Sequence, residues 1–242
     1  SRSLEPLKEL LSQQGYDLLE KNSFSESSKA DLIIVPGQRF EFSPRELDAV
    51  NSWINDGRHL MVALGAFTPN PVIQQWNMLL KGRGGSFDEG LICQPVVVAG
   101  ALMEGRQECA ILEITDEELN GQHPVNSSVI RSKRPLVFAA ARPLSFGRST
   151  NEFSELRLVR SSARAWLEET ERGQIFVQES GEPVGIQTLS VSSESWNSGM
   201  DKMRRGRLVL VGSEEVFKAH LPYNNDWARY VFAWLLGEDL NR

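Results

Sequence analysis

The feature that most constrains the fold is a regular alternation of buried strands and capped helices in the first third of the chain. The run Asp31 to Val35 is rich in β-branched residues and continuously apolar after its first residue, which is typical of a strand covered on both faces. A helical segment follows, and His59 to Leu64 has the pattern of the next strand. Because strands that alternate with helices pair through right-handed crossovers, the sequence predicts a parallel sheet flanked by helices.

The helix between these two strands has clear signals at both ends. Ser43 is placed to cap it, Pro44 occupies the first helical position, and Glu46 completes a capping box. Gly57 follows the last helical turn, where a residue with a positive φ ends many helices. We therefore expect this helix to begin and end at these residues.

Other segments continue the α/β pattern. A helix is expected over Ser3 to Gln14 and another over Asn70 to Leu80, from apolar residues at helical spacing. Tyr16 to Leu19 is a short candidate strand. Near the end of the chain, Arg207 to Val211 is a predicted buried strand and Asn225 to Leu236 a predicted closing helix.

The middle of the chain differs from both ends. Residues 86–192 consist of short alternating or apolar runs separated by long loops. We interpret this segment as a β-rich insertion or an added sheet within a single α/β domain that spans residues 1–242. The predicted fold class is α/β, with a flavodoxin-like parallel sheet.

Composition excludes several classes of protein. The chain has 242 residues, 40% of them hydrophobic, and its 32 acidic and 26 basic residues give a net charge of −6. This charge argues against a surface devoted to nucleic acid or anionic lipid, which need a concentrated positive field. Two cysteines, Cys93 and Cys109, are too few for a four-cysteine zinc site, although they could form one disulfide.

Several segments together resemble one protein family. The longest is "DLIIVPGQRFEFSPRELDAVNSWINDGRHLMVAL", which resembles the strand, Ser-Pro-x-Glu helix and second strand of the GldG-like proteins. Shorter segments, "GQHPV" and "LRLVRSSARAW", resemble the family's His-Pro turn and its Leu-x-x-Thr-Ser-x-x-x-Trp segment, and "GRLVLVGSEEVFKAHLPYNNDWARYVFAWLLG" resembles its final strand and closing helix. The resemblance spans nearly the whole chain and implies a class I glutamine-amidotransferase-like fold.

The resemblance also implies a function and a location. GldG-like proteins are auxiliary components of ABC transporters, either gliding-associated or uncharacterised. They place this domain on the far side of the cytoplasmic membrane, anchored by segments outside it. We therefore expect a periplasmic, non-catalytic binding or scaffolding domain of an ABC-type transport or envelope complex, with protein partners and without a cofactor. The chain starts without Met, which favours an upstream signal or anchor.

A serine-dependent hydrolase or transferase is the competing interpretation. An amidotransferase-like fold places its nucleophile on a sharp turn between a strand and a helix, and Ser213 is the one candidate at such a turn. Its base would be His123 or His220. The simpler interpretation makes Ser213 the N-cap of a short helix, with Glu214 and Glu215 favoured by the helix dipole.

Neither metal nor thiol chemistry is indicated. The histidines lack the spacing that brings two ligands together, and Cys93 and Cys109 lie in apolar surroundings without a nearby His or Lys pattern that would lower a thiol pKa. A third interpretation is a carbohydrate- or peptide-binding module, whose groove Trp166 or Trp196 would line.

The expected binding site lies at the carboxyl ends of the strands, where ligands of open α/β sheets bind. Three loops leave these ends, over residues 36–42, 65–70 and 212–215. The residues predicted to bind there are Gln38, Arg39, Thr68, Asn70, Ser213 and Glu214.

Overall fold

The computed structural model describes residues 4–24, 29–98, 101–147, 153–168, 176–196, 205–238 and 240. Its helices are α1 (Glu5–Gln13), α2 (Pro44–Asn55), α3 (Asn70–Leu80), α4 (Ser127–Ser132) and α5 (Leu221–Leu236), with short 3-10 helices η2 (Gln107–Ala110), η3 (Asp116–Glu118), η4 (Pro124–Asn126) and η5 (Glu214–Phe217). Its strands are β1 (Leu32–Pro36), β2 (His59–Ala63), β3 (Ser86–Phe87), β4 (Leu91–Cys93), β5 (Val96–Val98), β6 (Ala101–Met103), β7 (Ile111–Ile114), β8 (Leu136–Ala139), β9 (Leu144–Ser145), β10 (Phe153–Arg160), β11 (Trp166–Glu168), β12 (Thr188–Trp196) and β13 (Arg205–Val211).

The central sheet has five strands in the order β1-β2-β13-β12-β10. β1, β2 and β13 run parallel, whereas β12 and β10 are antiparallel to their neighbours. The sheet is therefore mixed, and the prediction of a parallel sheet is correct only for the first three strands. A short connection joins β12 to β13, and such a connection allows antiparallel pairing but is too short for a parallel crossover.

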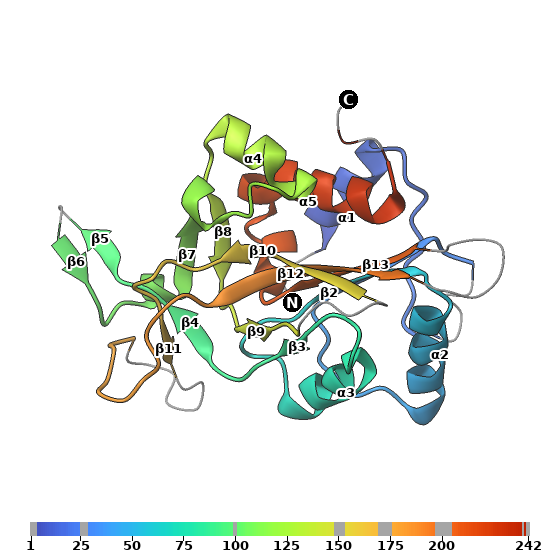
Figure 1. The fold of residues 1–242 in the computed structure, drawn as a ribbon, viewed down its shortest axis with the longest axis horizontal. Helices are drawn as coiled ribbons and strands as arrows, with labels where there is room; N and C mark the ends of the chain where they lie inside the picture. Colours follow the sequence, from blue (N-terminus) through green and yellow to red (C-terminus); the bar gives the residue numbers. More distant parts are fainter. Residues whose placement is uncertain are drawn as a thin grey trace.

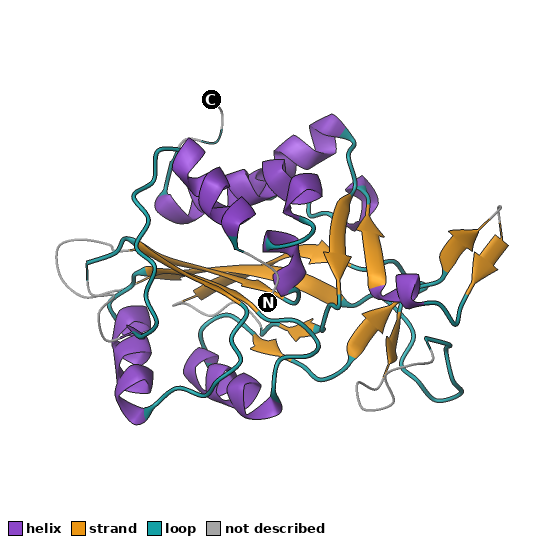
Figure 2. Ribbon diagram, turned by 180° about the vertical axis from the view of Figure 1, so that it is seen from behind, coloured by secondary structure: helices purple, strands orange, loops and turns teal. Residues whose placement is uncertain are grey.

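Helices cover both faces of this sheet. Figures 1 and 2 show α1, α4 and α5 on one face and α2 and α3 on the other. Side chains of β2 alternate between the two layers, because successive residues of a strand point to opposite faces. Met61 and Ala63 pack in the core with α1 and α5, while Leu60, Val62 and Leu64 pack in the core with α2 and α3.

The α2 helix confirms its predicted boundaries. The Ser43 side chain accepts a hydrogen bond from the backbone N–H of Glu46, and the Glu46 carboxylate accepts from the Ser43 N–H at 2.9 Å. Pro44 is the first helical residue, and Gly57 follows the C-terminus with a φ of 66°. The capping box thus places α2 after β1 as the sequence predicts.

The N-terminal segment follows the prediction in part. Leu7, Leu10 and Leu11 form the buried face of α1, and Gly15 follows the helix with a φ of 82°. Ser3, its predicted cap, lies outside the described residues. Residues 16–19 do not form a strand: Leu18 and Leu19 are exposed, and no strand of the described part pairs with them.

The middle segment, residues 86–192, joins the rest of the domain in two ways. Its strands β10 and β12 extend the central sheet. Its remaining strands form the two-stranded pairs β3-β9, β4-β11, β5-β6 and β7-β8. In Figure 1, β4, β11 and the β5-β6 hairpin form a lobe that extends away from the central sheet.

Candidate functional site

The loops at the carboxyl ends of β1, β2 and β13 lie together, as the sequence predicts. Arg39 follows β1, and its Nη1 donates a hydrogen bond of 3.5 Å to the carbonyl of Phe67, which follows β2. The Arg39 guanidinium also forms a short ion pair with Glu214, which follows β13. We call this region of three joined loops the carboxyl edge.

A buried carboxylate holds the carboxyl edge together. The Glu214 side chain is only 6% exposed and contacts two cations, Arg39 and Lys218, with the Lys218 Nζ 3.2 Å from Glu214 Oε2. Gly37 passes directly over this carboxylate with a φ of 91°, and a Cβ at Gly37 would lie 1.6 Å from Glu214 Oε2. Only glycine therefore allows the loop after β1 to close on Glu214.

A second buried charge fixes the loop after β2. Arg142 is 1% exposed, and its Nε donates to the carbonyl of Gly65 at 2.9 Å. Its Nη2 donates to the carbonyls of Ala66 and Thr68, at 3.1 and 3.4 Å. Burial lowers the pKa of Arg142 to about 10, so the guanidinium remains a cation at neutral pH.

Ser213 occupies the predicted N-cap position of η5, but its side chain does not cap the helix and is not an accessible nucleophile. Its side chain makes no capping hydrogen bond to η5 and is fully buried. Its Oγ donates a hydrogen bond of 2.5 Å to the carbonyl of Ala139. A carbonyl oxygen cannot remove the hydroxyl proton, so this position does not activate Ser213 for attack on a substrate.

His123 pairs with a different serine and in an unsuitable tautomer. Its Nδ1 accepts a hydrogen bond of 3.3 Å from the backbone N–H of Val125. In the neutral ring Nε2 must then carry the proton, which it donates to Ser192 Oγ, 3.3 Å away. Because Nε2 is already protonated, it cannot take a proton from Ser192, and the pair has a structural role. His220 lies at the start of α5, with its ring 6.3 Å from that of Tyr223.

The buried His123 predicts a pH-dependent stability. The ring is 4% exposed and stacks edge-on against Trp234. Burial, and secondarily the charge of Arg207, lower the pKa of His123 to about 4 from 6.5. Between these pH values the unfolded chain binds a proton that the folded chain does not, so stability falls as the pH falls. The loss is about 1.4 kcal/mol per pH unit, or about 3 kcal/mol from pH 6.5 to pH 4.

Urea unfolding of the wild type and of His123→Asn across this range measures the effect. Asparagine retains an acceptor for the Val125 N–H but does not titrate. As the pH falls from 6.5 to 4, the wild type should lose the free energy of unfolding that the His123 ring contributes, whereas the asparagine variant should not. The difference in the free energy of unfolding between the two proteins should therefore narrow steadily. An NMR titration that gives the His123 ring an ordinary pKa in the folded protein would contradict the prediction.

The other predicted binding residues have distinct positions. Gln38 braces the loop after β1: its Nε2 donates to the carbonyl of Phe40 at 2.6 Å, and its Oε1 accepts from Trp76 Nε1 at 3.0 Å. Thr68 is 3% exposed, so its side chain does not reach solvent. Asn70 is the exposed first residue of α3. Arg39 and Glu214 thus meet at the carboxyl edge, and together with Gln38 they hold its loops in position.

Two aromatic residues that the carboxyl edge presents to solvent were not predicted from the sequence. Phe40 is 84% exposed and Phe67 is 61% exposed, which is unusual for large aromatic side chains. They lie in the loops that Arg39 joins. The available signal was an aromatic residue in a short loop directly after each of two parallel strands, where side chains cannot all pack inward.

The Trp166 and cysteine predictions are settled by burial. Trp166 is fully buried and donates from Nε1 to Glu168, so it does not line a groove. The side chain of Trp196 lies outside the described residues. Cys93 and Cys109 are both buried free thiols, and burial, with the charge of Glu168 as a lesser cause, raises the pKa of Cys93. Neither thiol is poised for reaction.

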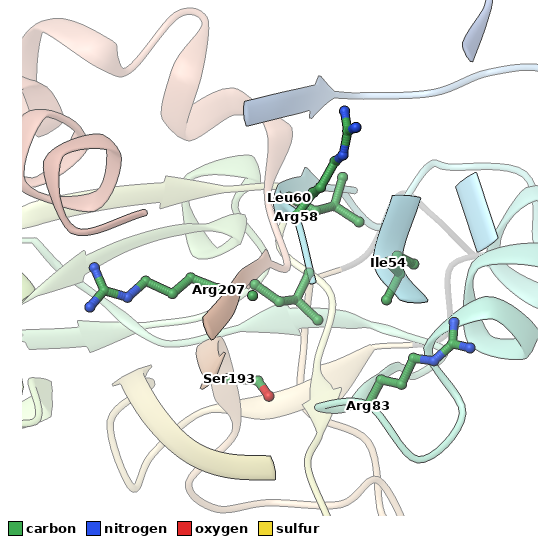
Figure 3. A pocket seen from close by; sticks show the side chains of 8 residues that line it. Ile54, Arg58, Leu60, Arg83, Ser193 and Arg207 are labelled. Carbon is green, nitrogen blue, oxygen red and sulfur yellow. The ribbon is translucent and has the colours of Figure 1, made fainter. Parts of the chain in front are cut away.

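A small depression lies at the opposite end of the sheet from the carboxyl edge. It is lined by Ile54, Arg58, Leu60, Arg83, Ser193, Gly206, Arg207 and Leu208 and has a volume of about 20 Å³, enough for one water molecule. Figure 3 shows the guanidinium groups of Arg58, Arg83 and Arg207 pointing in different directions. Arg207 pairs with Glu194 at 2.8 Å, and Arg83 donates to Asn51 and Asn55. The three cations therefore do not converge on an anion.

Two further properties concern metals and membranes. The described residues contain no group of three or more His, Cys, Asp and Glu side chains that could hold a metal ion. Within the same residues, no helix combines the length and the apolar character needed to cross a membrane.

Comparisons with known proteins show a likeness in fold to a solved structure. No family model and no curated protein matches the sequence. A solved structure described as "mmIFT52 N-terminal domain" matches with a TM-score of 0.68 and 16% sequence identity, over 98% of this chain and 91% of that chain. At such low identity the likeness concerns the fold alone. This chain is therefore similar in fold to the IFT52 N-terminal domain over nearly the whole length of both.

Proposed function

We propose that this chain is a non-catalytic binding domain that serves as a scaffold for protein partners. One observation carries the proposal: the carboxyl edge is closed by buried charges and presents Phe40 and Phe67 to solvent. A catalytic site in this position would need an accessible reactive group and a cavity. Here Ser213 and Glu214 are buried, with the Ser213 hydroxyl bonded to the Ala139 carbonyl and the Glu214 carboxylate paired with Arg39 and Lys218.

The exposed phenylalanines are suited to anchor a protein. Burying one phenylalanine side chain contributes about 2 kcal/mol, and aromatic residues are enriched among the side chains that dominate protein interfaces. The loops that carry them are fixed in advance by Gln38, Arg39 and Arg142. A fixed loop loses little conformational entropy when it binds, so the burial energy is largely retained as affinity.

We extend this proposal to the setting that the sequence resemblance implies. The fold is proposed to be of the flavodoxin-like or class I glutamine-amidotransferase-like type, because three parallel strands alternate with helices on both faces. The partner is proposed to be a permease or another envelope component of an ABC-type complex, with this domain held on the periplasmic side. The support for this setting is the similarity to GldG-like proteins in the segments around α2 and α5.

Site-directed crosslinking in the full-length gene product tests the proposal. The photoreactive residue p-benzoylphenylalanine, a close analogue of phenylalanine, is introduced at Phe40 or Phe67 and irradiated in cells. We expect a crosslinked protein adduct at both positions, because both aromatic rings are proposed to contact a partner. The matched control position is Met78 of α3, whose exposed fraction of 61% equals that of Phe67 but which lies outside the carboxyl edge.

The outcomes test the binding site and the identity of the partner separately. Adducts at positions 40 and 67 but not at 78 support a binding site at the carboxyl edge. Their identification as an ABC permease supports the proposed complex, and another protein would overturn that part alone. Failure to crosslink at both phenylalanines, or equal crosslinking at Met78, would overturn the binding site.

A further inference from the structure

The β5-β6 hairpin projects from the domain with little support from it. Val96 pairs with Met103, Val97 with Leu102 and Val98 with Ala101. Residues 101–108 are all exposed, and Figures 1 and 2 show the hairpin at the far end of the lobe. A two-stranded ribbon with so little contact to a core is marginally stable in water. An additional strand would therefore stabilise the hairpin.

The base of the hairpin is nevertheless fixed to the domain. Gly105 donates its N–H to the carbonyl of Phe176 at 2.7 Å, and Cys109 Sγ donates to the carbonyl of Met103 at 3.7 Å. Val96 packs against the buried cluster that contains Cys93, Cys109 and Trp166. The two strands thus leave the domain from a defined position.

The strands lack the features that usually protect an exposed sheet edge. Natural edges carry lysines, prolines or bulges that prevent pairing with another chain. Here β5 is Val-Val-Val and β6 is Ala-Leu-Met, with regular pairing throughout. Val97 is 70% exposed and Leu102 is 52% exposed, and as cross-strand partners they form one apolar face. Within the described residues, no other strand pairs with β5 or β6.

The surroundings of the hairpin are acidic. The segments 104–108 and 178–182 lie together, because the Gln178 N–H donates to Glu104 Oε2 at 3.1 Å. Together they contain four glutamates and one arginine, and that arginine, Arg106, already pairs with Glu108. A second copy of this chain would bring like charges together at the hairpin, which is unfavourable. A segment with lysine or arginine side chains would instead be attracted.

We infer that the β5-β6 hairpin is a docking arm that binds an extended segment of a partner protein, in which apolar residues alternate with lysine or arginine. The segment adds to an edge of the hairpin as a third strand, so its backbone pairs with the free N–H and C=O groups. Its apolar side chains cover Val97 and Leu102, and its cations contact the neighbouring glutamates. This surface is separate from the carboxyl edge, and the inference does not depend on the proposed function.

A short peptide that alternates valine and lysine serves as the probe, and a valine-glutamate peptide of equal length is its control. We expect the valine-lysine peptide to slow amide hydrogen exchange in residues 96–103 of the intact chain, because the added strand protects backbone N–H groups. The valine-glutamate peptide should give no protection there. Binding of the lysine peptide should also weaken as salt is added.

The variant Leu102→Lys places a cation on the hairpin edge. We expect this variant to bind the valine-lysine peptide about tenfold or more weakly than the wild type does. Met78→Lys, on the exposed side of α3, makes the same change at a comparably exposed site and should leave binding unchanged. Both variants should keep the thermal midpoint of the wild type, since neither side chain lies in the core.

Three results would overturn the inference. The first is protection from amide hydrogen exchange elsewhere but not in residues 96–103. The second is equal protection of residues 96–103 by the two peptides, and the third is an equal loss of affinity for the valine-lysine peptide in the two variants. A concentration-dependent dimer that Leu102→Lys abolishes would also overturn it, because the occupant would then be a second copy of this chain.

Discussion

Replacing Asn224 with alanine should lower the free energy of unfolding by about 3 kcal/mol. Asn224 lies in α5, and its side chain is fully buried against the edge of β8. Its Oδ1 accepts from the Val137 N–H and its Nδ2 donates to the Val137 carbonyl, both at 2.8 Å. The amide thus pairs with β8 as a neighbouring strand would. Alanine leaves two buried backbone groups of Val137 without partners, each at a cost of about 1 to 3 kcal/mol.

The adjacent residue provides the control. Asn225 is exposed on the same helix, and Asn225→Ala should change stability by no more than about 0.5 kcal/mol. Urea unfolding followed by circular dichroism measures both variants, and the prediction concerns the difference between their midpoints. Equal midpoints for the two variants would show that the Asn224 amide contributes nothing to the attachment of α5.

Gly212→Ala should destabilise the protein by a similar amount and also weaken partner binding at the carboxyl edge. A Cβ at Gly212 would lie 2.1 Å from the carbonyl oxygen of Arg142, a backbone atom that cannot move aside freely. The close approach is fixed by hydrogen bonds from the Arg142 N–H to the Gly212 carbonyl and from the Gly212 N–H to the Leu189 carbonyl, at 2.7 and 2.8 Å. We expect a loss of about 3 kcal/mol or more.

The loss of binding follows from the position of Gly212. It directly precedes Ser213 and Glu214, and its displacement shifts Arg142, which holds the loop containing Phe67. Crosslinking from Phe67 should therefore decrease in a Gly212→Ala background even at a temperature where the variant is folded.

Gly121→Ala is the matched control for this substitution. A Cβ at Gly121 meets only Ile130 Cδ1, at an ordinary contact distance of 3.8 Å, and its φ is not in the left-handed region. Its stability should remain within about 1 kcal/mol of the wild type. If Gly121→Ala and Gly212→Ala unfold at the same urea concentration, the close contact with Arg142 is not what restricts position 212 to glycine.

The sequence alone predicts those features that depend on short-range signals. The capping box of Ser43 and Glu46 and the terminating Gly57 define α2 to within a residue, because the groups that satisfy the helix ends are only three residues apart. The continuous apolar runs of β1, β2 and β13 predict correctly that these strands belong to a parallel arrangement, although not the order in which they pair. They also place the loops of the carboxyl edge together, since parallel strands end on the same side of a sheet.

Features that depend on partners distant in sequence were not predicted. β10 and β12 join the central sheet as antiparallel strands, and their alternating pattern does not specify which sheet they join. Ser213 has the local context of an N-cap, but its hydroxyl instead meets the carbonyl of Ala139, 74 residues away in sequence. Tyr16 to Leu19 has the composition of a strand but pairs with no strand of the described residues, because composition does not provide a partner.

The candidate site likewise combines features that the sequence predicts with features that depend on partners distant in sequence. The amino-acid sequence by itself determined the α/β alternation, the capped helix α2 and the meeting of the three loops at one edge of the sheet, because these follow from periodicity and from groups near in sequence. Only the tertiary structure decided that Arg39 and Lys218 neutralise Glu214 beneath Gly37, and that Phe40 and Phe67 remain in solvent. Burial and charge compensation depend on which segments meet in space, and here segments about 175 residues apart in sequence meet.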